Sequence, residues 1–104
     1  MKSSKKELMR RLETLRLYAE VLDELVCPIC DERAEVVMEI GEIKQKLDLP
    51  VRNRGVERRK LAHHKAKSRH PDYVGRCLQA VMDISCDVQE ARRRRRRHRT
   101  TKPK

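Results

Sequence analysis

The chain has 104 residues, of which 41% are charged and 38% are hydrophobic, and its formal net charge is +11. This length allows one small domain, and a hydrophobic share below the usual level of about 45–50% allows only a thin core. No segment approaches the roughly 18 apolar residues of a membrane span, and the N-terminus does not have the form of a secretory signal. We therefore expect no membrane partner and an intracellular, reducing location, which in a eukaryotic cell means nucleus, nucleolus or cytoplasm.

Two helices are predicted in the first half of the chain. Ser4 and Glu7 have the spacing of a capping box, and apolar residues then recur at alternating spacings of four and three. These residues are Leu8, Leu12, Leu15, Ala19, Leu22 and Val26. Pro28 disfavours helical backbone for the residue before it, so the first helix should cover about 4–26 and the second about 31–47. The short link between them predicts an antiparallel helical hairpin.

Two further helices are predicted, a basic one over about 56–69 and an apolar-striped one over about 71–90. No segment shows the period-two alternation of a strand, so the fold class is all-α, a small bundle. The helical domain should comprise residues 1–91, and residues 92–104 should be a disordered, Arg-rich basic tail. Because the core is thin and the apolar seam is long, we expect a homodimer.

Positive charge is concentrated in two blocks. Residues 92–104 carry nine Lys or Arg and no acidic residue, whereas residues 1–91 have a net charge of only +2. A block of like charge stays solvated and attracts polyanions. The second block spans residues 52–76. The predicted nucleic-acid-binding residues of the two blocks are Arg52, Arg54, Arg58, Arg59, Lys60, Lys65, Lys67, Arg69, Arg92, Arg93, Arg94, Arg95, Arg96, Arg97 and Arg99.

The composition also suggests which nucleic acid is bound. Readers of single strands stack bases on aromatic side chains, and this chain has two Tyr, no Phe and no Trp. We therefore predict backbone recognition of duplex or structured RNA, favoured over DNA. In composition the chain resembles small accessory RNA-binding proteins of viruses, including suppressors of RNA silencing. One alternative is a DNA-binding regulator, and another is a zinc-stabilised protein-interaction adaptor with a basic targeting tail.

No constellation of catalytic residues stands out in the sequence. There is no Ser/His/Asp set, no paired-carboxylate arrangement and no zinc-protease helix motif. The chain is therefore predicted to be a non-enzyme with no small-molecule substrate.

Cys27-Pro28-Ile29-Cys30 has the spacing of half a zinc site. Cys77 and Cys86, nine residues apart, would point to opposite sides of one helix and cannot both reach one ion. A zinc site would instead take Cys27, Cys30, Cys77 and one of His63, His64 and His70, of which His70 is the first choice because it lies at a predicted helix break. The competing interpretations of Cys27 and Cys30 are two small apolar residues in a helix–helix turn or a redox pair. The turn is favoured, so no metal and no cofactor are predicted.

Overall fold

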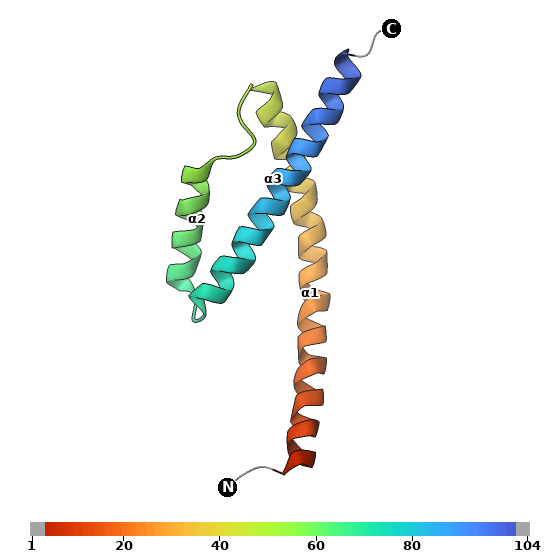
Figure 1. Ribbon diagram of the computed structural model, residues 1–104, viewed down its shortest axis with the longest axis vertical. Helices are drawn as coiled ribbons and strands as arrows, with labels where there is room; N and C mark the ends of the chain where they lie inside the picture. The colour runs from red at the N-terminus through yellow and green to blue at the C-terminus, as the bar shows by residue number, and fades with distance from the viewer. Residues whose placement is uncertain (1–3, 102–104) are drawn as a thin grey trace. The chain divides into compact units, whose positions relative to one another are not determined.

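Three α-helices and no β-strand make up residues 4–101, the part of the chain that the computed structural model describes. They are α1 (Lys5–Lys46), α2 (Arg54–Lys67) and α3 (Pro71–Thr101) (Figure 1). The chain divides into two compact units, one up to Arg33 and the other from Ala34 onward. The predicted all-α fold class is confirmed. None of the described helices has an apolar stretch long enough to cross a membrane.

Helix α1 is continuous where the sequence predicted a hairpin. It begins after Ser4, whose side-chain oxygen accepts a hydrogen bond from the backbone N–H of Glu7 at 3.2 Å, as the capping box predicted. Pro28 lies inside this helix, so the predicted turn at 27–30 is wrong. A helix-interior proline removes one backbone donor and costs about 3 kcal/mol, but it does not by itself reverse the chain.

The apolar seam of α1 explains why the helix continues. Its spacing of three and four residues stays in phase across Pro28, with Arg33 taking one place. The apolar members around the proline are Val26, Ile29, Val36, Ile40 and Ile43.

Helices α2 and α3 pack side by side (Figure 1). Asn53 caps α2, because its side-chain oxygen accepts from the backbone N–H of Val56 at 3.1 Å. Helix α3 begins at Pro71 and continues to Thr101, past the predicted helix end near residue 90. Residues 92–101, expected to be a disordered tail, are thus helical, and arginine is a good helix former.

The core of the second unit is small and partly polar. Its buried hydrophobic residues are Val37, Val51 and Met82, and its buried polar or charged residues are Glu57, Gln89 and Arg93. Burying such groups is costly unless each one is hydrogen-bonded. A functional site is therefore expected where Glu57, Gln89 and Arg93 find their hydrogen-bond partners.

Candidate functional site

Lys44 near the end of α1 and Gln89 in α3 form a polar pair. The ammonium of Lys44 donates to the carbonyl of Val51 at 2.7 Å and lies 3.5 Å from the amide oxygen of Gln89. Gln89 is only 6% exposed, and its amide nitrogen donates to the carbonyl of Val37 at 2.8 Å. That second bond turns the amide oxygen toward Lys44. Each of the two side chains therefore contacts the other and also bonds to a backbone carbonyl of the second unit.

Gly41 makes room for Gln89. A Cβ at this position would lie 2.8 Å from Cγ of Gln89, closer than real side-chain contacts come. A glycine in a helix interior lowers helix stability by about 1 kcal/mol relative to alanine. In the structure its lack of a side chain lets α3 approach α1 at the level of the polar pair.

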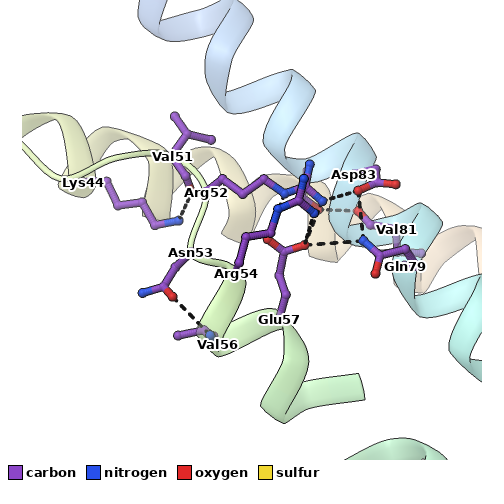
Figure 2. A network of polar contacts seen from close by, with 11 residues as sticks. Lys44, Val51, Arg52, Asn53, Arg54, Val56, Glu57, Gln79, Val81 and Asp83 are labelled. Carbon is purple, nitrogen blue, oxygen red and sulfur yellow. Dashed lines mark hydrogen bonds and ion pairs between the residues drawn. The ribbon is translucent and has the colours of Figure 1, made fainter. Parts of the chain in front are cut away.

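A second cluster centres on Arg52, next to Val51 in the loop between α1 and α2 (Figure 2). Its guanidinium donates to both carboxylate oxygens of Glu57, at 2.9 and 2.8 Å, and also to Asp83 of α3. The amide nitrogen of Gln79 donates to Asp83 at 3.0 Å and to Glu57 at 3.4 Å. This network ties the loop and α2 to α3.

The network controls the ionisation of its carboxyl groups. The hydrogen bond from Arg52 lowers the pKa of Glu57, against the opposing effect of burial. The same donor, together with Gln79, lowers the pKa of Asp83. Nearby, burial raises the pKa of the Cys86 thiol. Both carboxyl groups are therefore ionised at neutral pH and neutralise Arg52.

Lys44 differs from Arg52 in its partners. Both acceptors that the structure gives Lys44 are neutral oxygens, a backbone carbonyl and an amide. Among the described residues no ion pair of Lys44 with a carboxylate is seen, so this half-buried cation can still interact with a further anion. The Lys44–Gln89 pair is thus suited to bind or stabilise negative charge.

Arg92, Arg93 and Arg96, from the predicted tail, contact other parts of the protein. Arg92 and Arg96 pair with Glu42 at 3.2 and 2.6 Å, and Arg96 also donates to the Gln45 side chain at 3.0 Å. Arg93 is buried and donates to the backbone carbonyl of Leu49 at 2.8 Å. These contacts offset part of the like-charge repulsion that led us to predict disorder.

Some of the other predicted nucleic-acid-binding residues also make contacts within the fold. Arg54 lies 3.8 Å from Glu57, and the side-chain carbons of Lys65 lie beside Gly75. The remaining members are exposed, namely Arg58, Arg59, Lys60, Lys67, Arg69, Arg94, Arg95, Arg97 and Arg99. Part of the basic surface inferred from the sequence is therefore used inside the fold.

The predicted zinc ligands are not brought together in the described residues. Cys27 and Cys30 lie in α1 within the first unit, whereas His70 and Cys77 belong to the second. All four cysteines are free thiols. Residues 4–101 contain no group of three or more His, Cys, Asp or Glu that could hold a metal ion.

Sequence reasoning missed Lys44, Glu57 and Gln89 as site residues. One signal was present, because Glu57 is the only acidic residue between positions 49 and 71, among seven basic ones before residue 68. A single acidic residue in a basic helix can pair with an arginine, and this pairing offsets part of the cost of burying its carboxylate. Gln89 gave no comparable signal, since its partners Lys44 and Val37 are far from it in sequence.

Comparison with known families gives one match. The family model for chorismate mutase type II matches residues 15–90, well over half of the chain. The matched range includes Lys44, Arg52, Glu57 and Gln89 and ends before the arginine run. Searches of curated proteins and of solved structures found no match.

The family match corrects several predictions made from the sequence. Chorismate mutases are enzymes that act on a small molecule, so the predicted non-enzyme without a small-molecule substrate is wrong. The RNA-binding function, its viral-suppressor analogy and the nucleic-acid partner are overturned by the same finding. Net charge indicated a polyanion, but charge alone does not distinguish a nucleic acid from a small anion and internal ion pairs. Chorismate mutases need no cofactor, in agreement with the prediction that none is used.

Proposed function

Since the chain belongs to the chorismate mutase type II family, we propose that it converts chorismate to prephenate. The observation that carries this proposal is the family match over residues 15–90. The reaction rearranges one molecule: an ether C–O bond breaks, a C–C bond forms, and no atom enters or leaves. It needs no co-reactant, so the protein contributes binding, orientation and electrostatic stabilisation.

The chemistry of the substrate agrees with the charge at Lys44. Chorismate carries two carboxylates, and negative charge develops on its ether oxygen as the C–O bond breaks. Lys44 has three N–H donors, of which Val51 and Gln89 account for two. We assign the third to the reacting molecule, because a positioned donor is most effective where charge develops in the transition state.

Gln89 supports this role by its placement. Its buried amide restricts the ammonium of Lys44 to one side and offers a second N–H beyond the one bonded to Val37. The Arg52 network fixes the loop that carries Val51, the other acceptor of Lys44. We also place the enzyme inside the cell in a reducing compartment, as its sequence predicted, but with no role for nucleus or nucleolus.

The test is turnover of chorismate by the purified protein. We expect loss of the conjugated-diene absorbance of chorismate and appearance of prephenate by NMR, faster than in a heat-inactivated blank. Lys44→Ala should lower kcat/KM by about 100-fold or more, the effect of removing one transition-state donor. Lys46→Ala removes the same charge from an exposed position of the same helix and should leave turnover nearly unchanged.

Two results would count against these assignments. A wild-type protein that turns over chorismate no faster than the blank would overturn the proposed function. Full activity in Lys44→Ala would leave the function standing but remove Lys44 from it.

A further inference from the structure

The arginine run lies outside the family match, yet it contacts the segment that carries Lys44. Resting on the proposed function, we propose that Arg93, assisted by Arg92 and Arg96, is a positioning residue for the Lys44–Gln89 pair. These three arginines are called the arginine clamp below.

Arg93 anchors the exit of α1. The last carbonyls of a helix have no intrahelical partner, and the chain leaves α1 through Asp48 in the left-handed region, at φ 54. Leu49 is then held at both ends: its N–H donates to the carbonyl of Lys44 at 2.8 Å, and its carbonyl accepts from Arg93 at 2.8 Å. Two residues later Val51 provides the carbonyl that binds the Lys44 ammonium.

Arg92 and Arg96 contact side chains near the same end of α1. Both pair with Glu42, two residues before Lys44, and Arg96 also donates to Gln45, one residue after it. The contacts of the arginine clamp thus bracket Lys44 on both sides in sequence. Arg92 and Arg93 are three and four residues after Gln89, so they lie on the same side of α3 as that amide.

Burial supports a positioning role over a purely stabilising one. Arg93 is only 9% exposed, and the buried Nε atoms of Arg92 and Arg93 have no hydrogen-bond partner. Burying a guanidinium with incomplete hydrogen bonding is a poor way to gain stability, and an apolar residue often does as well. What the guanidinium of Arg93 adds is a directed bond to one carbonyl, which fixes the loop relative to α3.

The experiment compares Arg93→Gln with Arg94→Gln. Both remove one charge from adjacent positions of α3, but Arg94 is exposed. We expect Arg93→Gln to lower kcat by about 10- to 100-fold, the order of loss caused by small misplacements at a reacting centre, with little change in KM. Arg94→Gln should match the wild type, and Arg93→Lys, which keeps a donor for Leu49, should recover part of kcat.

A second readout does not depend on turnover. The side-chain amide of Gln89 is buried and bonded to Val37, so its NH₂ resonances in a ¹⁵N–¹H spectrum report its position. They should shift in Arg93→Gln and remain in place in Arg94→Gln. If Arg93→Gln does not fold, the half-exposed pair Arg92→Gln with Arg96→Gln is used in the same comparison.

The outcomes separate the two proposals. If the wild-type protein is inactive, the proposed function is wrong. The Gln89 resonances then still test whether the arginine clamp positions Gln89. Unchanged kcat and unchanged Gln89 resonances in folded Arg93→Gln overturn the clamp while the proposed function stands. Equal losses in Arg93→Gln and Arg94→Gln would show a general charge effect and overturn it as well.

Discussion

The ammonium of Lys44 lies 3.5 Å from the amide oxygen of Gln89, although the two residues are 45 positions apart in the sequence. Each is also bonded to a backbone carbonyl, Lys44 to Val51 and Gln89 to Val37. The pair therefore joins the end of α1, the following loop and the middle of α3. Any change that moves one of these three parts should register in the other two.

Gly41→Ala tests how closely Gln89 must approach α1. The added methyl group would lie 2.8 Å from Cγ of Gln89, so that side chain has to move. We expect a loss of about 1–3 kcal/mol in the free energy of unfolding, measured with urea, together with a fall in kcat.

Gly75→Ala is the matched control for that substitution. Its methyl group would meet Cδ of Lys65 at 3.1 Å, part of a flexible side chain that can move away. The alanine should leave activity unchanged and stabilise α3 by up to about 1 kcal/mol. Similar losses in both variants would contradict the special role of Gly41.

The Arg52 network predicts a defined dependence of stability on pH. Arg52 lowers the pKa of Glu57 and of Asp83 in the folded protein, so the unfolded chain takes up protons first as the pH falls. This contribution is complete above the ordinary carboxyl pKa of about 4 and is lost as the pH falls through the lowered values. Denaturation between pH 3 and 7 should show this decline in the wild type.

Arg52→Gln should flatten the same pH profile. Without the guanidinium, Glu57 and Asp83 lose the donor that most favours their ionised forms, although Gln79 still bonds to both and Arg54 still lies 3.8 Å from Glu57. Stability at pH 7 should fall more than stability at pH 3. Parallel curves for the wild type and the variant would show that the network does not set the pH dependence.

Asn53→Ala tests the start of α2. Its side chain accepts from the N–H of Val56, and removing such a cap costs about 1 kcal/mol. The loss should appear as a lower midpoint in thermal melting followed by circular dichroism. Asn53→Ser keeps a capping oxygen and should melt close to the wild type. If the alanine variant melted like the wild type, the cap would contribute nothing measurable.

Self-association through the α1 seam stays a prediction. The seam residues Leu8, Leu15 and Leu22 are exposed in the first unit, and their three-and-four spacing is typical of helices that pack lengthwise. A second copy of the chain is the simplest partner. Sedimentation should show a dimer, Leu15→Glu should dissociate it, and Leu17→Glu, off the seam, should not. A monomeric wild type at high micromolar concentration would contradict this expectation.

Helix content could be predicted from the sequence, but the path of the chain could not. Apolar spacing located helical segments in α1 and in the first part of α3, but it did not predict that helix continues through residues 92–101. Pro28 was given too much weight, since the boundary rule for prolines is a tendency and the seam stayed in phase across it. Continuity of that phase was the better guide.

The candidate site was harder to predict from the sequence than the fold. Arg52 was singled out by its charge, but its partners Glu57 and Asp83 are set by the packing of α2 on α3. Lys44 and Gln89 are brought together by contacts over 45 positions, and no local pattern encodes that distance. Composition likewise described how much charge the arginine run carries, but not that Arg92, Arg93 and Arg96 contact the end of α1 and the loop after it.

The identity of the residues in that run has a consequence for tolerance to change. The inward positions are Arg92, Arg93 and Arg96, and every residue from 92 to 97 is arginine. Lengthening the repeat, or shortening it by one, would leave arginine at all three positions, although each insertion turns the following helix by 100°. Because the run is repetitive, the insertion or loss of one arginine within it would not change the residue type at the three contacting positions. Gln89 has no such protection, since its neighbours are Val88 and Glu90.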